Sequence, residues 1–273
     1  MRIFQVDAFT DVVFHGNPAA VCIVEGTVSD AWMQAVAAEM NLSETAFVRQ
    51  LPGALELRWF TPVTEVELCG HATLAAAHVL FESGEARRRV EFATRSGTLG
   101  AIRVGHAISL ELPALPAMPV AVPDGLAAAL GTELRAAARS RVDLLVEVDD
   151  EATVHALRPD LAALARVVDA DGVIVTAACS AAVDGAGAGA GAARAAGADF
   201  VSRYFAPAIG IDEDPVTGAA HCVLAPYWSG RLGRDRLVGY QASRRGGVVR
   251  VALGADRVEL TGRAVTVFSG ELR

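Results

Sequence analysis

Short apolar runs and turn residues alternate along the first part of the chain. Residues 3–9 and 19–24 are apolar runs of strand length, and a Gly-Asn-Pro turn separates them. Runs of this length bounded by turn residues are typical of β-strands. Residues 29–41 instead repeat apolar positions at helical spacing behind an N-cap at Ser29 or Asp30. The pattern predicts two strands followed by a helix.

The pattern continues in the same way up to residue 113. Residues 45–50 and 55–62 have strand character, and residues 72–84 predict a helix with Gly84 just beyond its end. Residues 89–113 predict two or three antiparallel strands joined by glycine-containing turns.

Four prolines between Pro113 and Pro123 mark the clearest boundary in the sequence. After this boundary the order of element types repeats, which predicts a second domain of similar construction. The expected elements are a helix at about 124–138, a strand at 142–148, a helix at 159–168, strands at 172–178 and 199–207, a further helix, and strands at 238–243, 246–253 and 257–262. Residues 182–198 are mostly glycine and alanine, and we expect a mobile loop there because they bury little surface.

A weak internal repeat supports two similar domains. Residues 58–77 align with 203–222 at an offset of 145, which places Arg58 on Arg203 and Cys69 on Asp214. A competing register at an offset of 148 pairs two glycines instead. Each copy joins a strand to a helix that begins with small residues, and such helix N-termini favour anions. The repeat predicts an anion-binding cradle built from two helix starts.

Composition narrows the classes of function. The chain has 273 residues, 52% of them hydrophobic, and a net charge of −8 without a basic cluster, so nucleic-acid binding is not expected. No apolar run approaches the ~20 residues that cross a bilayer, and we expect a cytoplasmic protein with no membrane partner. The four cysteines show no paired spacing, so neither disulfides nor a metal site is expected.

Four motifs in one order resemble the PhzF-like family, which is named for a phenazine-biosynthesis isomerase. They are DAFTDVVFHGNPAAV, MNLSETAFV, CGHATLAAAHVL and DEDPVTGAAH. The resemblance implies an α+β fold of the diaminopimelate-epimerase type, in which two pseudo-symmetric lobes each wrap a mostly antiparallel sheet around a central helix. It implies that residues 264–273 complete an N-terminal lobe of residues 1–113, with 114–123 as a linker and 124–263 as the C-terminal lobe. A homodimer is a further expectation.

The resemblance also assigns roles to residues of this chain. It implies a cofactor-free site between the lobes, where Glu44, the acid of the SET motif, moves a proton and His71 and Asp214 assist. The residues expected to bind a small carboxylate substrate are Asn17, Cys69, Gly70, Ala72, Thr73, Thr217, Gly218 and Ala219. Ala219 stands where the phenazine enzyme has a serine, and Cys69 stands where diaminopimelate epimerases have a catalytic cysteine.

Each candidate also has a structural interpretation. Glu44 is suited to general-base work if its carboxylate is partly desolvated, but it could equally be a turn acid. Asp214 could cap a helix, with Pro215 in the first helical turn. His78 and His221 are expected to pack inside helices, and Asp212 and Glu213 to face solvent. A Cys69–His71 hydrolase dyad is disfavoured, because residues two apart at a helix start should diverge and no orienting acid is evident.

Three functions therefore remain open. The leading hypothesis is a cofactor-independent isomerase that shifts a proton on a small, cyclic or amino acid-like carboxylate through Glu44. The second is a two-base epimerase or racemase that uses Cys69 and Asp214. The third is a non-enzymatic protein that binds a metabolite on the same scaffold.

Overall fold

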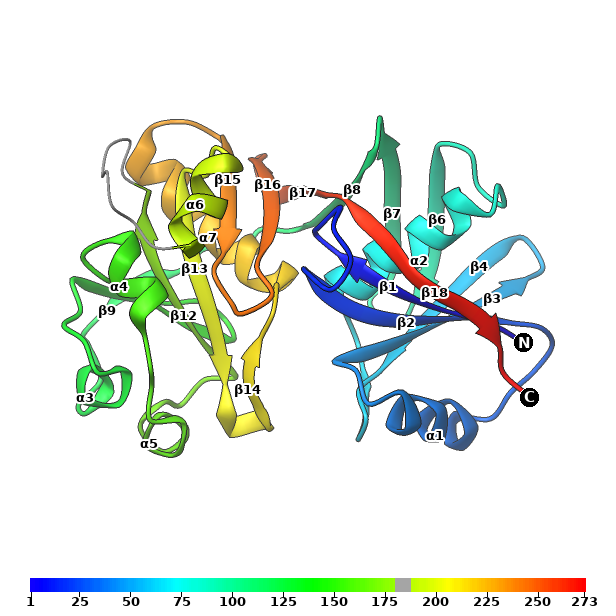
Figure 1. Cartoon of the computed structure of the whole chain (residues 1–273), viewed down its shortest axis with the longest axis horizontal. Coiled ribbons are helices and arrows are strands. Elements are labelled where there is room, and N and C mark those ends of the chain that lie inside the picture. Colours follow the sequence, from blue (N-terminus) through cyan, green and yellow to red (C-terminus); the bar gives the residue numbers. More distant parts are fainter. Residues whose placement is uncertain (180–187) are drawn as a thin grey trace. The chain divides into compact units, whose positions relative to one another are not determined.

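The computed structural model describes residues 1–179 and 188–273. Within this part the chain divides into two compact units (Figure 1). Unit 1 comprises Met1–Leu112 and Glu259–Arg273, and unit 2 comprises Pro113–Val258. Each unit has an α+β architecture in which a mostly antiparallel sheet curves around one central helix.

The sheet of unit 1 follows the order of its strands closely. Strands β1, β2, β3 and β4 pair in sequence, and only the β2–β3 pair is parallel because α1 crosses between them. Strand β6 pairs in parallel with β4 and antiparallel with β7, which in turn pairs with β8. The elements are β1 (Arg2–Ala8), β2 (Asn17–Val24), α1 (Asp30–Met40), β3 (Glu44–Leu51), β4 (Ala54–Phe60), β5 (Glu65–Val66), α2 (Gly70–Glu82), β6 (Arg89–Thr94), β7 (Gly97–Val104) and β8 (Ala107–Pro113).

Unit 2 repeats this plan. Strands β11 and β12 form a parallel pair across a helical crossover, β12 and β13 are antiparallel, and β13 pairs in parallel with β15. Strand β15 then pairs antiparallel with β16. The elements are β9 (Met118–Val120), α3 (Leu126–Leu130), β10 (Ala136–Arg139), β11 (Asp143–Glu147), α4 (Glu151–Ala156), α5 (Leu161–Val167), β12 (Gly172–Ala178), α6 (Ala188–Ala195), β13 (Phe200–Ala206), the 3-10 helix η1 (Pro207–Ile209), β14 (Ile211–Asp214), α7 (Gly218–Leu232), β15 (Arg236–Gln241) and β16 (Gly247–Leu253). Strand β17 (Arg257–Gly262) begins in unit 2 and continues into unit 1.

The central helix of each unit is buried on nearly all sides. Every residue of α2 from His71 to Ala77 is buried, and α7 buries nine of its residues. A helix of this kind cannot be amphipathic, and its small side chains let the surrounding strands approach closely. The polar groups placed on α2 and α7 are therefore held in dry, rigid surroundings.

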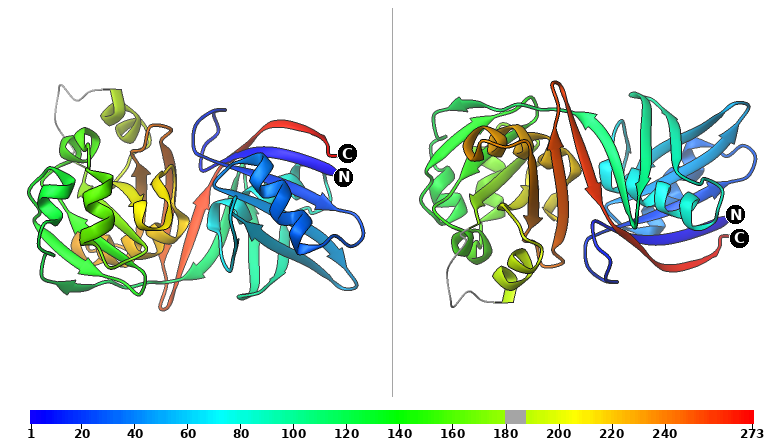
Figure 2. Two further views of the ribbon diagram at one scale, coloured as in Figure 1. Left: turned by 90° about the horizontal axis from the view of Figure 1, so that it is seen from below. Right: turned by 90° about the horizontal axis from the view of Figure 1, so that it is seen from above.

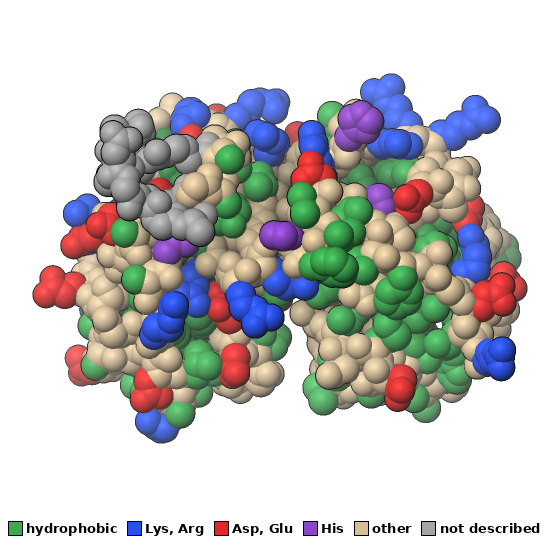
Figure 3. All heavy atoms as spheres, in the orientation of Figure 1, with side chains coloured by type: hydrophobic (Ala, Val, Ile, Leu, Met, Phe, Trp, Pro, Cys, Tyr) green, Lys and Arg blue, Asp and Glu red, His purple; other side chains and the backbone are tan. Residues whose placement is uncertain are grey.

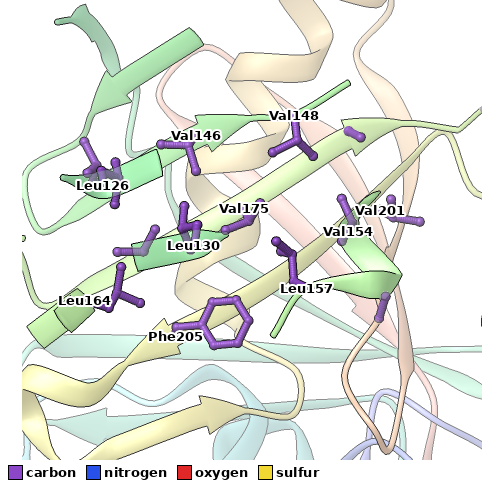
Figure 4. Close-up of a cluster of buried hydrophobic side chains, with 14 of the residues drawn as sticks. Leu126, Leu130, Val146, Val148, Val154, Leu157, Leu164, Val175, Val201 and Phe205 are labelled. Atoms are coloured by element: carbon purple, nitrogen blue, oxygen red, sulfur yellow. The ribbon is translucent and has the colours of Figure 1, made fainter. Parts of the chain in front are cut away.

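The core of unit 2 forms between the sheet and the short helices on its outer face. Figure 4 shows valines of β11, β12 and β13 meeting leucines of α3 and α5 around Phe205. This cluster anchors β13, the strand that leads into the DEDPVTGAAH motif of residues 212–221. Burial of its apolar side chains stabilises the unit at about 25 cal/mol per Å².

The last strand returns to the first one. Strand β18 (Ala264–Glu271) pairs antiparallel with β1, with Arg2 opposite Glu271 and Ala8 opposite Ala264. Figure 2 shows the two strands side by side, with the chain termini adjacent. This pairing joins residues 264–271 to the sheet of unit 1, to which Glu259–Arg273 belong. Strand β9 has the corresponding position in unit 2, where it pairs with β10.

The internal repeat corresponds to a repeated structural device. Arg58 of β4 forms a bidentate ion pair with Glu65 of β5. Arg203 of β13 forms the equivalent bidentate ion pair with Glu213 of β14. The arginines are 145 positions apart and the glutamates 148, so the turn containing η1 is three residues longer in unit 2. Both registers in the sequence are thus correct, one before this turn and one after it.

The second register corrects one alignment. Helix α2 begins at Gly70 and α7 at Gly218, so the N-cap Cys69 corresponds to the N-cap Thr217. Asp214 corresponds to Val66, since each lies opposite the equivalent residue of the preceding strand. The alignment of Cys69 with Asp214 is therefore wrong.

Several expected elements differ in the structure. The helix expected at 124–138 is only α3, because Gly131 adopts a left-handed conformation and ends it, and residues 136–139 form β10. Residues 118–120 of the expected linker form strand β9. Residues 188–195 form helix α6 instead of a mobile loop, while residues 182–187 lie outside the described residues.

The distribution of charged side chains on the surface agrees with the composition of the chain. Arginines and acidic side chains are interspersed on the face of each unit shown in Figure 3, without a large basic patch. Among the described residues, no helix is long and apolar enough to cross a membrane.

Candidate functional site

Glu44 is the first residue of β3 and lies where the chain leaves α1. The helix ends in a left-handed turn at Asn41, after which β3 joins β2 in parallel register with Glu44 opposite Ala19. Only 14% of the Glu44 side chain is exposed. A carboxylate in this position is partly desolvated, as a carbon base requires.

His71 lies in the first turn of α2 and faces Glu44. Its Nε2 is 3.2 Å from Oε2 of Glu44, and its side chain is 5% exposed. The distance is that of an ion pair, although the two groups do not have the angular geometry of a hydrogen bond. The structure thus brings together two of the predicted catalytic residues within unit 1.

The other ring nitrogen of His71 has two polar neighbours. Nδ2 of Asn17 is 3.3 Å from Nδ1, and Sγ of Cys69 is 3.5 Å from it. Asn17 reaches this position because Gly16 adopts a φ of +63°, and a Cβ at Gly16 would lie 2.1 Å from the Ala8 carbonyl oxygen. The Gly-Asn turn therefore has a steric reason.

Cys69 and His71 do not diverge as expected. Cys69 is the N-cap of α2 in an extended conformation, which turns its side chain back toward the imidazole. Glu44, which approaches the other ring nitrogen, supplies an acid partner that local sequence did not reveal. The argument against a Cys69–His71 pair was therefore wrong in its geometry.

Glu44, Cys69 and His71 form the only cluster of potential metal ligands among the described residues. One donor atom each from Glu44, Cys69 and His71 lies within 4.8 Å of the others. Glu44, however, approaches Nε2 of the ring while Cys69 approaches Nδ1. A metal ion binds one imidazole nitrogen at a time, and the two side chains approach different nitrogens, so this placement does not favour three-fold coordination.

The predicted residues of unit 2 form a second polar group. Asp214 ends β14, is 8% exposed and accepts a hydrogen bond from the Thr217 hydroxyl. It lies before the helix without capping it, because α7 begins at Gly218 with Thr217 as its N-cap and Pro215 lies outside the helix. The helix-cap interpretation of Asp214 is therefore wrong.

Gln241 of β15 holds this group in place. Its Nε2 donates to the Asp214 carbonyl oxygen at 2.8 Å, and its Oε1 accepts from the Thr217 amide at 2.8 Å. Gln241 is fully buried. Nothing in the local sequence distinguishes it, since the 27-residue separation from Asp214 is closed only by the β13–β15 pairing.

The remaining predicted ligand residues differ in exposure. Ala72 and Thr73 are buried in unit 1, and the Thr73 hydroxyl donates to the Cys69 carbonyl oxygen at 2.6 Å. Gly70 and Gly218 are the first residues of α2 and α7, where free backbone amides are available. Ala219 is exposed.

Two further expectations concern acids and histidines. Asp212 is exposed, as predicted, but Glu213 is paired with Arg203 and is only 23% exposed, so its solvent-facing assignment was wrong. His221 is fully buried in α7 and packs beside the Phe200 ring, as predicted. Burial lowers the pKa of His221 to about 4, which keeps its ring neutral.

Fold and site together define a class: an α+β protein of the diaminopimelate-epimerase type with a carboxylate–imidazole centre at the start of a buried helix. The family model described as phenazine biosynthesis-like protein matches residues 6–270. The chain belongs to this PhzC-PhzF family.

Individual relatives are similar to this chain over nearly its whole length. An uncharacterized isomerase from Halalkalibacterium halodurans is 45% identical, over 99% of this chain and 97% of the relative. A PhzF-family crystal structure from Enterococcus faecalis has a TM-score of 0.91 at 39% identity, covering 100% of this chain and 98% of that one. A predicted epimerase from Pseudomonas aeruginosa shares the fold at a TM-score of 0.74 and 23% identity, covering 99% and 98%. The isomerase named among these relatives supports an isomerase, and the epimerase structure shows the shared fold.

Proposed function

We propose that this chain is an isomerase that moves a proton between carbon atoms of a small carboxylate, with Glu44 as the acid and base. The observation that carries the proposal is the contact between the largely buried Glu44 carboxylate and Nε2 of His71. Isomerase-named relatives at 45% identity support the reaction class.

The two residues have complementary tasks in such a reaction. Glu44 takes a proton from carbon and returns it to another position, which requires a carboxylate that is not fully hydrated. The charge that develops on the substrate needs a donor, and His71 at the start of α2 stands beside the base. We assign His71 to polarise the substrate and to exchange protons with Glu44.

Asp214 is proposed to orient the substrate. Its carboxylate is fixed by Thr217, and its backbone is fixed by Gln241. The free amides at the start of α7, from Gly218 onward, favour an anionic group of the substrate. A small carboxylate, cyclic or amino acid-like, fits this set of donors.

The sequence bears on the type of chemistry. All 24 residues in the Lys-plus-Arg count are arginines, so no lysine side chain is present. A lysine amine is the group that forms Schiff bases with carbonyl substrates and pyridoxal phosphate. Proton transfer in this chain is therefore proposed to rely on carboxylate and imidazole groups.

The decisive experiment is solvent exchange with Glu44→Gln. Small carboxylates are incubated in D₂O with the native protein, and deuterium incorporation is followed by mass spectrometry. Glu44→Gln should lower incorporation by about 10²-fold or more while binding, measured by calorimetry, stays within a few-fold. Unchanged exchange in the variant would remove Glu44 from the mechanism.

A two-base epimerase is the second candidate, and the position of Cys69 favours keeping it. The thiol lies 3.5 Å from His71 in the same cluster, although the alignment that paired it with Asp214 does not hold. This candidate predicts that Cys69→Ser loses stereoinversion in the same assay. Full activity in Cys69→Ser would leave Glu44 as the base.

A further inference from the structure

The polar contacts on the Nδ1 side of His71 specify which nitrogen carries the proton. Asn17 is fully buried and its amide nitrogen lies 3.3 Å from Nδ1. An imidazole that is neutral has one N–H and one acceptor nitrogen, and its neighbours select between the two tautomers. The identity of the group facing Nδ1 is therefore chemically consequential.

Ser43 contacts the other end of the Asn17 amide. Its hydroxyl donates to Oδ1 of Asn17 at 3.5 Å, and Nδ2 is directed toward His71. The Cys69 thiol, also a donor, is the second neighbour of Nδ1 at 3.5 Å. The Asn17 amide nitrogen can only donate, so opposite this group Nδ1 is the acceptor, and the thiol can donate to it as well.

We infer that Asn17 is a positioning residue that holds His71 in the Nε2–H tautomer. In this tautomer the protonated nitrogen is the one that lies 3.2 Å from Oε2 of Glu44. Asn17 was expected to bind substrate, but its side chain is buried and engaged with Ser43 and His71. Its role is thus to act on the substrate through His71.

The tautomer matters for Glu44, and this step rests on the proposed function. An Nε2–H group favours an ionised carboxylate beside it, which is the form that can remove a proton from carbon. The opposite tautomer would place an unprotonated nitrogen beside the carboxylate, an arrangement that favours the protonated form of Glu44. Asn17 therefore keeps the base in its working form.

The test is nitrogen NMR of histidine-labelled protein without substrate. His221 is an internal reference, because its Nδ1 lies 2.8 Å from the Thr217 carbonyl oxygen and has to be the N–H nitrogen. Native protein should show His71 as Nε2–H and His221 as Nδ1–H. Asn17→Asp places an acceptor at Nδ1, so His71 should change to Nδ1–H or to the imidazolium while His221 is unaffected.

The controls distinguish an effect on the His71 tautomer from misfolding and from a loss of activity. Asn41→Asp makes the same chemical change at the exposed end of α1 and should leave His71 as in native protein. Asn17→Asp should also lower kcat for deuterium exchange by about 10²-fold with KM changed only a few-fold. If Asn17→Asp does not fold, Asn17→Ser, which removes the amide, is the second variant. Its His71 nitrogen signals should be broadened or should show a mixture of the two tautomers.

An Nδ1–H tautomer of His71 in native protein would overturn the inference, whatever the activity. So would an Asn17→Asp protein with an unaltered His71 spectrum. If the tautomer changes as expected but exchange by Glu44→Gln equals that of native protein, the proposed function fails and the assignment of Asn17 to the tautomer stands.

Discussion

Single residues in equivalent helices acquire different properties from their neighbours. His71 in α2 stands among Glu44, Asn17 and Cys69, whereas His221 in α7 contacts the Thr217 carbonyl oxygen and the Phe200 ring. The neighbours of His71 are polar side chains that can donate or accept protons. The environment of His221 excludes a positive charge, and the ring of His221 serves packing.

The buried His221 predicts an acid-sensitive unit 2. Its pKa is about 4 in the folded state, below the ordinary value of 6.5, so the unfolded state binds the proton first as the pH falls. The stabilising contribution is complete above about pH 6.5 and is lost as the pH approaches 4, with a slope of up to about 1.4 kcal/mol per pH unit. Urea unfolding between pH 7 and pH 4 measures this slope.

The matched variants are His221→Gln and His106→Gln, the latter at an exposed histidine. His221→Gln should be less stable at pH 7, because it loses the packing beside Phe200, but its stability should depend less on pH. A pH dependence in His221→Gln equal to that of native protein would contradict this account of the acid limb.

At the scale of elements, one arginine in each unit joins three parts of the chain. Arg58 pairs with Glu65 of β5 and with Asp30 of α1, the helix that crosses between β2 and β3. Arg203 pairs with Glu213 of β14 and donates to the Leu157 carbonyl oxygen at the end of α4, within the corresponding crossover. Each arginine also stacks on the phenylalanine two residues later.

The two arginines should differ in their contribution to stability. Arg203→Met leaves Glu213 without an ion-pair partner among the described residues and should lower the free energy of unfolding of unit 2 by about 3–5 kcal/mol. Arg58→Met should lower the free energy of unfolding of unit 1 by less than this, because Glu65 keeps its ion pair with Arg95. Native-state hydrogen exchange of peptides from β4 and β13 gives both values. Equal losses would show that the additional partner of Glu65 is without effect.

At the scale of the whole molecule, unit 1 is discontinuous in sequence. Its first strand lies between β2 and the last strand β18, so the edge of its sheet is covered only when residues 264–271 are present. An exposed strand edge offers unpaired backbone groups to other chains. The chain order therefore couples the folding of unit 1 to the C-terminus.

Truncation after Gly262 should affect the two units unequally. Loss of β18 should abolish protection of β1 and β2 amides against hydrogen exchange, since β1 loses its pairing with residues 264–271. Protection of β12 and β13 in unit 2 should stay close to that of the native protein. Equal loss of protection in both units would contradict independent core formation.

Much of the element order could be predicted from the sequence, because strand runs and helix signals are local. The helix predicted at 72–84 is α2 (Gly70–Glu82), and the strands predicted at 172–178 and 257–262 are β12 and β17. The failures occurred where local signals were weak: alanine-rich residues 136–139 became a strand through pairing with β11, and alanine and glycine at 188–195 became a helix. Pairing and packing override propensity at such positions.

The site shows the same division. The sequence by itself determined the chemical groups, namely the Glu44 carboxylate, the His71 imidazole and the helix start that carries Cys69, because motifs record residue types at fixed spacing. Only the tertiary structure decided that Asn17 and Glu44 approach different nitrogens of one imidazole ring, and that Gln241 holds Asp214. These contacts join residues 27 to 54 positions apart, and sheet pairing sets such distances where no local pattern can.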